Sequence, residues 1–284
     1  MDNKKIIIFK DKNSYIGSGH FHRSMNLKKN LLKIKFNTKL IVHTEKISSY
    51  IRASKYLENI DLAILDTPID NSILFRAFRN CNTKTIAFDW FGNFIPDYNV
   101  VIFPHKKIKY KKRKFVGLEF INIRDEFLLK KQNKINNKAL VTIGTSDKKN
   151  QGQEIYTMLK DKNVPVNVLK GKFTKYKNKI NKDFISFKNK NFSKLLNNYS
   201  YIISSGGSTL FEANYLNKNI FVIPQTIQEK RIASLFLSRK AILGHSKKNI
   251  YNFDFDKSNR LICKKIVDGK GILRIMNIIK KIIK

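Results

Sequence analysis

Short apolar runs rich in β-branched residues alternate along the chain with segments long enough to form helices, and this alternation restricts the fold more than any other feature. Strands that alternate with amphipathic helices pair side by side in one direction, so the pattern predicts an α/β fold with parallel sheets. The expected strands occupy residues 5–9, 40–43, 62–66, 85–89, 100–103, 139–144, 166–169, 201–204 and 220–223. Several end directly in Gly, Asp, Ser or Pro, which is typical of a site at the carboxyl ends of strands.

The strand–helix series begins twice, on either side of the polar segment 129–138, which lacks apolar periodicity. A chain of 284 residues is also long for a single hydrophobic core. We therefore expect two α/β domains, over residues 1–134 and 135–265, followed by a C-terminal helix over residues 266–284. Five apolar residues share one face of that helix: Ile272, Ile275, Met276, Ile279 and Ile283. Because only one end of the helix is strongly basic, we expect it to pack back onto the first domain rather than lie on a membrane.

The formal net charge of +36, from 57 Lys and Arg against 21 Asp and Glu, first suggests a nucleic acid or an anionic membrane as partner. The excess is mostly Lys, it is spread along the chain, and it accompanies many Asn and Ile, as expected when an AT-rich genome drives codon choice. We therefore interpret the charge as solvated surface with a bias toward anionic substrates. A nucleic-acid-binding protein is an alternative, but no known binding motif accompanies the charge, so we expect no nucleic-acid partner.

Cysteine usage and hydropathy bear on the compartment in which the protein is found. Cys81 and Cys263 lie far apart in the sequence and fit no metal-ligand spacing. No apolar run approaches the roughly 18 residues that cross a membrane, and no signal peptide is visible. We expect a cytoplasmic monomer with no metal and no cofactor, which makes at most a weak peripheral contact with an anionic membrane.

The stretch GSGHFHRS (residues 17–24) lies between an expected strand and an expected helix. The amino end of a helix favours an anion, and Gly17 and Gly19 would let a substrate approach the backbone. His20 and Arg23 lie three residues apart on the same face, where a neutral imidazole could take a proton from water. Arg23 could hold His20 or meet a phosphate. Alternatively, His20 is a polar cap residue and Arg23 a surface charge, and the spacing alone leaves both interpretations open.

A second glycine loop, SSGGST (residues 204–209), repeats this arrangement in the second half of the chain. The N–H groups of Gly206 and Gly207 and the hydroxyls of Ser208 and Thr209 could surround a diphosphate without a metal. Glu212 fits either a capping box with Thr209 or a carboxylate that accepts hydrogen bonds from a ribose. No Gly-Lys-Ser/Thr follows the glycines, which excludes a Walker-type loop.

A third loop, Gly144-Thr145-Ser146-Asp147, follows the first expected strand of the second domain. It either lines a cleft between the domains, with Gly144 and Ser146 toward the substrate, or serves as an ordinary helix cap.

These motifs occur together and in order over nearly the whole chain: IGSGHFHRSMNL, LAILDTPID, VGLEFINIRDEF, LVTIGTSDKKN, VLKGKFTKYKN, IISSGGSTLFEANYLNKNIFVIPQ and VDGKGILRIMNII. As a set they resemble the UDP-sugar hydrolase of the pseudaminic acid pathway and its spore-coat-polysaccharide relatives. The resemblance implies two Rossmann-like domains that face a cleft, a fold of the glycosyltransferase-B type, with the nucleotide on the second domain. In these hydrolases water attacks the anomeric carbon and releases UDP and a free diacetamido-trideoxy sugar. The alternative is a UDP-sugar-dependent glycosyltransferase of the same fold in cell-surface polysaccharide synthesis.

Carried over residue by residue, the resemblance makes His20 the base or water-positioning group, with Gly19 and Arg23 completing its motif. It assigns the diphosphate to residues 206–209 and the ribose to Glu212. The other residues assigned to the substrate are Gly17, Asp66, Gly144, Ser146, Gln228 and Glu229. The chain departs from the family pattern in four places. Asp89-Trp90 replaces Asp-Asp, Gln228-Glu229 replaces Asn-Gln, Gly144-Thr145 replaces Gly-Gly, and the segment 101–105 lacks the amide-rich pattern of the family. We expect these positions to touch the sugar or the cleft.

Overall fold

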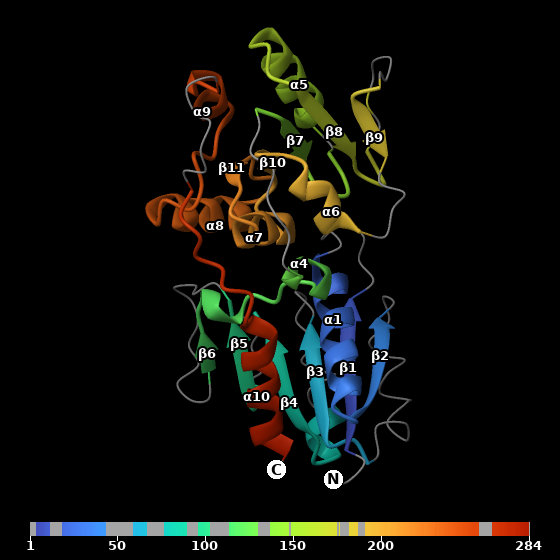
Figure 1. Ribbon diagram of the computed structural model, residues 1–284. Helices are drawn as coiled ribbons and strands as arrows, with labels where there is room; N and C mark the ends of the chain where they lie inside the picture. Colours follow the sequence, from blue (N-terminus) through green and yellow to red (C-terminus); the bar gives the residue numbers. More distant parts are fainter. Residues whose placement is uncertain are drawn as a thin grey trace. The chain divides into compact units, whose positions relative to one another are not determined.

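The computed structural model describes residues 4–11, 19–43, 59–66, 77–89, 96–102, 114–129, 137–147, 149–174, 176, 182–186, 191–255 and 263–283. The described chain forms two compact units (Figure 1). Unit 1 comprises Met1–Asn122 and Gly269–Lys284, and unit 2 comprises Ile123–Asp268. Most of the expected linker 129–138 lies outside the described residues.

Unit 1 contains a six-stranded sheet in which every pair of neighbouring strands is parallel. The strand order is β2-β1-β3-β4-β5-β6. The strands are β1 (Lys5–Asp11), β2 (Asn37–His43), β3 (Leu62–Asp66), β4 (Lys84–Phe88), β5 (Tyr98–Val101) and β6 (Lys114–Val116). Helix α1 (Gly19–Lys33) connects β1 to β2, and the short 3-10 turn η3 (Leu118–Phe120) follows β6. All five residues of β3 are buried, as expected for a central strand of a parallel sheet covered on both faces.

Unit 2 contains a five-stranded parallel sheet with the order β11-β10-β7-β8-β9. The strands are β7 (Ala139–Thr142), β8 (Val166–Lys170), β9 (Phe184–Ser186), β10 (Tyr201–Ser204) and β11 (Asn219–Val222). The helices are α4 (Asp125–Leu128), α5 (Gln151–Asp161), α6 (Phe192–Asn197), α7 (Ser208–Tyr215), α8 (Ile227–Ser238) and α9 (Lys247–Asn252). Two parallel α/β units therefore confirm the expected fold class.

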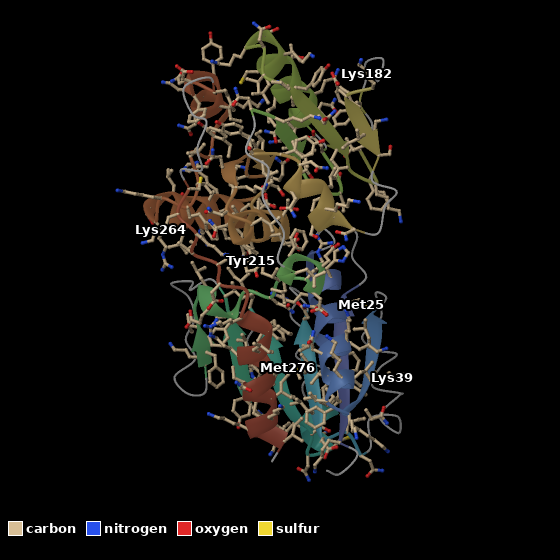
Figure 2. The ribbon with its side chains drawn as sticks, viewed as in Figure 1. Met25, Lys39, Lys182, Tyr215, Lys264 and Met276 are labelled. Carbon is tan, nitrogen blue, oxygen red and sulfur yellow. The ribbon has the colours of Figure 1, made fainter. Side chains whose placement is uncertain are left out.

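The C-terminal helix α10 (Gly271–Ile283) belongs to unit 1, as the pattern of its apolar residues predicts. All five residues predicted for its apolar face are buried, and Met276, labelled in Figure 2, is one of them. Ile278 and Ile282 are buried as well, so the contact face is wider than predicted. The helix is anchored at both ends, because Gly271 packs against the backbone of Ile121 and Lys84 Nζ donates to the carbonyl oxygen of Ile282 at 2.6 Å.

Three findings concern metal ligands, cysteines and membrane-spanning helices. Within the described ranges, no group of three or more His, Cys, Asp or Glu side chains is placed to hold a metal ion. Cys81 and Cys263 are both free thiols. No helix in the described part of the chain combines the length and the apolar character needed to cross a membrane.

Lys218 gives unit 2 a predicted pH dependence of stability. It lies between α7 and β11, fully buried, with Nζ 3.2 Å from the carbonyl oxygen of Asn197. Burial lowers the pKa of Lys218 from 10.5 to about 8. Between these two values the folded protein has lost a proton that the unfolded chain still binds, so the free energy of unfolding should rise with pH across this window.

The variant Lys218→Met should lack this rise and should be more stable than the native chain below about pH 8. Urea unfolding at a series of pH values measures both effects, with the exposed Lys230→Met as the matched control. Parallel curves for the native chain and Lys218→Met would contradict the prediction.

Candidate functional site

The loop between β10 and α7 presents uncapped helix donors at the carboxyl end of the sheet of unit 2. Ser204 ends β10, α7 begins at Ser208, and Gly207 is its N-cap residue without any side-chain capping bond. In the part of the chain that the structure describes, the hydroxyls of Ser208 and Thr209 and their N–H groups donate to no protein atom. Since a helix amino end carries partial positive charge, these groups form a donor set suited to an anion.

Glu229, in the first turn of α8, packs against Gly206 of this loop. A Cβ on Gly206 would lie 2.7 Å from Cβ of Glu229 and 2.9 Å from its Cα, so only glycine fits where α8 begins. Glu229 Oε2 accepts a hydrogen bond from the N–H group of Gln225 at 2.6 Å. Burial raises the pKa of Glu229 above its ordinary value, and the hydrogen bond from Gln225 acts against that shift. The neighbouring Gln228 is exposed.

Glu212 is buried and engaged by a residue that the sequence analysis did not single out. Its two carboxylate oxygens accept from Nε and Nη2 of Arg124 at 2.6 and 2.8 Å. Arg124 precedes α4, and its guanidinium also lies 5.0 Å from the ring centre of Phe127. Burial alone would lower the pKa of Arg124, but the hydrogen bonds and charge of Glu212 raise it above the ordinary value.

This geometry shows that the capping-box interpretation of Glu212 is wrong. Thr209 is already the second residue of α7, and the N-cap position belongs to Gly207. The role of Glu212 toward a ribose stays a prediction. Arg124, the partner of Glu212, had only one signal in the sequence, its place in the motif VGLEFINIRDEF.

The loop after β7 lies beside the glycine loop because β7 and β10 are neighbours in the sheet. Gly144 has φ +93°, which favours glycine, and a Cβ there would lie 3.6 Å from Oγ of Ser205. Asp147 ends the loop and accepts from the N–H groups of Gln151 and Gly152 at 2.9 and 2.6 Å. The loop is therefore a cap for α5, as the second interpretation had it, and Ser146 lies half-buried within it.

In unit 1, Arg23 joins α1 to the ends of two strands. Its Nε donates to Asp66 Oδ2 at 2.9 Å, its Nη2 also binds Asp66, and its Nη1 donates to Asp89 at 3.0 Å. Ser24 donates a further hydrogen bond to Asp66 at 2.9 Å. Burial disfavours the charge of Arg23, but both carboxylates raise its pKa above the ordinary value.

These contacts change the interpretation of the first glycine loop. Arg23 and Asp66, both assigned to the substrate or the chemistry, are occupied with each other, and the side chain of Asp66 is almost fully buried. Gly17 lies outside the described residues. Gly19 and His20 open α1, but the side chain of His20 is outside the description as well. The catalytic assignment of His20 stays a prediction.

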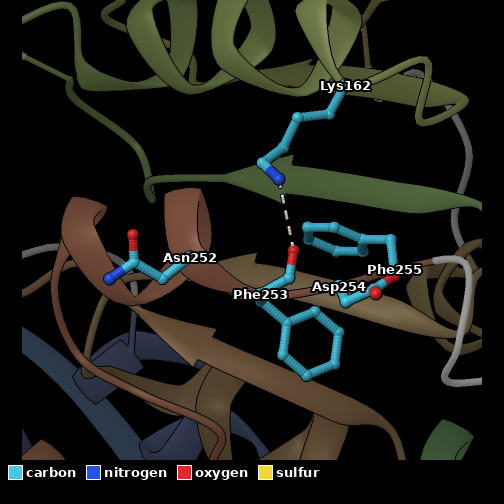
Figure 3. A pocket seen from close by; sticks show the side chains of 5 residues that line it. All are labelled: Lys162, Asn252, Phe253, Asp254 and Phe255. Carbon is cyan, nitrogen blue, oxygen red and sulfur yellow. Dashed lines mark hydrogen bonds between the residues drawn. The ribbon is translucent and has the colours of Figure 1, made fainter.

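A pocket of about 200 Å³ lies elsewhere in unit 2, lined by Lys162, Asn252, Phe253, Asp254 and Phe255 (Figure 3). Lys162 follows the last residue of α5, so the pocket lies toward the amino ends of the strands, at the opposite edge from the glycine loop. Lys162 Nζ is 3.4 Å from the carbonyl oxygen of Phe253, and no predicted site residue lines the pocket.

Comparison with known proteins supports the fold and leaves the activity open. No protein-family model matches the chain. An uncharacterised protein of Methanocaldococcus jannaschii is 25% identical over 287 aligned residues, covering 83% of this chain and 58% of that protein. The chain thus spans little more than half the length of this relative.

Three solved structures share the fold over nearly their whole length. MurG of Acinetobacter baumannii has 12% identity and a TM-score of 0.66, with 98% of this chain and 99% of that chain covered. MnaA of S. aureus bound to UDP has 14% identity and a TM-score of 0.61, with 98% and 96% covered. The glycosyltransferase SsfS6 of Streptomyces sp. SF2575 bound to thymidine diphosphate has 8% identity and a TM-score of 0.59, with 98% and 99% covered. The fold is therefore of the glycosyltransferase-B type with two Rossmann-like units.

The bidentate contact between Arg124 and Glu212 yields a prediction for the stability of unit 2. Glu212→Leu removes two hydrogen bonds from the Arg124 guanidinium, which keeps Glu126 as a partner, so it should lower the free energy of unfolding by about 1.5–3 kcal/mol. The double variant Arg124→Leu/Glu212→Leu should recover most of this loss. Urea unfolding followed by circular dichroism measures both.

The control is Glu126→Leu, because Glu126 also pairs with Arg124, at 3.1 Å, but is partly exposed. It should cost less than about 1 kcal/mol. An equally small effect of Glu212→Leu would show that the buried pair does not stabilise the unit.

Proposed function

We propose that this chain is an enzyme that acts on a UDP-linked sugar, and that it is a glycosyltransferase of cell-surface polysaccharide synthesis. The observation that carries this proposal is the uncapped start of α7, which follows a glycine loop at the carboxyl end of β10. The same fold binds UDP in MnaA and thymidine diphosphate in SsfS6, a named glycosyltransferase. Both the local donor set and the fold thus favour a nucleoside diphosphate as ligand.

In this proposal the diphosphate binds at the loop of residues 205–209. The N–H groups and hydroxyls of Ser208 and Thr209 are directed donors, and the dipole of α7 adds partial positive charge at the same place. As the bond between the anomeric carbon and the diphosphate breaks, negative charge grows on the departing UDP. Donors already oriented toward that charge stabilise the transition state more than the ground state.

For unit 1 the proposal assigns His20 as the base that takes the proton of an acceptor hydroxyl. His20 belongs to the first turn of α1, where the positive end of the helix dipole disfavours the charged imidazolium. Arg23 serves as a positioning residue, because both ends of its guanidinium are bound by Asp66 and Asp89. It fixes the first turns of α1 against β3 and β4 and thereby the backbone of His20.

A hydrolase is the second candidate, favoured by the motifs IGSGHFHRSMNL and IISSGGSTLFEANYLNKNIFVIPQ. It would use the same nucleotide loop and the same histidine, with water in place of the acceptor hydroxyl. The two activities differ only in the nucleophile, so an acceptor requirement distinguishes them.

The test is UDP release from a panel of UDP-linked N-acetylated and diacetamido sugars, with and without sugar acceptors. We expect release that needs an acceptor, and a loss of about 10²–10⁴-fold in His20→Ala because a general base is removed. His22→Ala, in the same turn of α1, is the matched control and should retain activity.

Release without any acceptor that depends on His20 would instead establish the hydrolase. If the chain neither binds UDP nor releases it from any sugar, the enzyme proposal is wrong. Activity that is equal in His20→Ala and in the native chain would remove His20 from the mechanism but leave the substrate class intact.

A further inference from the structure

Phe173 is a large apolar side chain that lies exposed at the same edge of unit 2 as the glycine loop. It belongs to the loop that directly follows β8, and it is 54% exposed. Tyr176, three residues later, packs its ring against that of Phe184, with 5.2 Å between the ring centres. Because apolar surface is unfavourable in water, Phe173 keeps a ring exposed that a ligand with a flat apolar face would cover.

The backbone that carries Phe173 is fixed against the neighbouring loop. The N–H of Phe173 donates to the carbonyl oxygen of Thr145 at 2.9 Å, and the N–H of Thr174 donates to that of Gly171 at 3.0 Å, which closes a tight turn. A Cβ on Gly171 would lie 2.3 Å from the carbonyl oxygen of Gly144, so only glycine fits there. The loop after β8 is therefore packed closely onto the loop after β7.

The order of the strands brings this ring near the proposed diphosphate site. β8 pairs with β7 and β7 pairs with β10, all in parallel, so the loops after the three strands share one edge of the sheet. The loops after β7 and β10 also approach each other, since a Cβ on Gly144 would lie 3.6 Å from Oγ of Ser205. Two strand spacings separate β8 from β10, roughly 10 Å. This is close to the span from the diphosphate to the base of a nucleotide, with the ribose between them.

The neighbouring Lys172 makes this ring better suited to a nucleotide than to a neutral ligand. Its Nζ lies 5.5 Å from the centre of the Phe173 ring, an arrangement in which the ammonium is attracted to the face of the ring. A planar base needs one face of an aromatic ring for stacking, and the positive charge beside the ring favours a ligand that carries phosphates.

We propose that Phe173 stacks against the base of the nucleotide whose diphosphate binds at the glycine loop. The proposal rests on the proposed function, because it places the diphosphate at residues 205–209. It deepens that function by naming a specificity-determining residue for the nucleoside part of the substrate. Every base has a flat π face, so Phe173 supplies affinity for the nucleoside without selecting uracil.

Calorimetric titration of the full chain with UDP and with inorganic pyrophosphate tests the proposal. Phe173→Ala should bind UDP about 5- to 100-fold more weakly than the native chain, as expected when one stack between a base and an aromatic ring is lost. It should bind pyrophosphate as the native chain does, because pyrophosphate has no base. Phe173→Tyr keeps the ring and should bind UDP as the native chain does.

Tyr251→Ala is the matched control. Tyr251 is likewise exposed, at 62%, and likewise has a lysine over its ring, with Nζ of Lys162 at 5.6 Å from the ring centre. It belongs to α9 and lies beside the pocket at the opposite edge of the sheet from the glycine loop. Its variant should bind UDP and pyrophosphate as the native chain does. Circular dichroism of each variant establishes that it is folded.

Phe173→Trp adds a readout that a merely structural role would not give. The chain contains a single tryptophan, Trp90, so the native chain serves as the reference for fluorescence. UDP should change the emission of Phe173→Trp more than that of the native chain, because the base then lies against the new ring. Pyrophosphate should change the emission of both proteins equally.

The outcomes separate this inference from the proposed function. If the native chain binds UDP and Phe173→Ala binds it equally well, the inference is overturned and the proposed function stands. Equal losses for UDP and pyrophosphate, or a Phe173→Tyr variant as weak as Phe173→Ala, also overturn it, because the effect then does not come from a ring on the base. If the native chain binds neither UDP nor pyrophosphate, the proposed function fails, and this inference fails with it.

Discussion

Pairing between guanidinium and carboxylate groups is the interaction that fixes helix α1 of unit 1 and helix α7 of unit 2. In unit 1, Arg23 of α1 binds Asp66 at the end of β3 and Asp89 just after β4. In unit 2, Arg124 binds Glu212 in the second turn of α7. An unpaired charge in such a place would cost several kcal/mol, so Arg23 holds α1 against the ends of β3 and β4, and Arg124 holds α7 against the segment before α4. The glycine loop of residues 204–209 leads into α7 and is therefore held in place with it.

This pairing separates the residues that hold the site from those available to a ligand. The sequence suggests Arg23, Asp66 and Glu212 as catalytic or binding groups. In the structure, Arg23 and Asp66 form an ion pair with each other, and Glu212 forms one with Arg124. What the loop before α7 offers instead is neutral: N–H groups and hydroxyls at a helix start. An anion at this loop would therefore meet oriented dipoles rather than the flexible side chains of lysines.

Apolar runs predicted the buried strands and missed the short, exposed ones. The strands β3, β7, β10 and β11 are wholly buried, so their apolar composition predicts them directly, although β11 lies at a sheet edge. The strands β6 and β9 have three residues each, are partly exposed and lie at sheet edges, where composition carries little signal. The pairs could not be predicted either, because Arg124 and Glu212 are 88 residues apart and no local pattern couples them. The capping box at Thr209 was predicted because the sequence does not fix the first residue of a helix. In the structure α7 begins at Ser208, one residue earlier than the capping box requires.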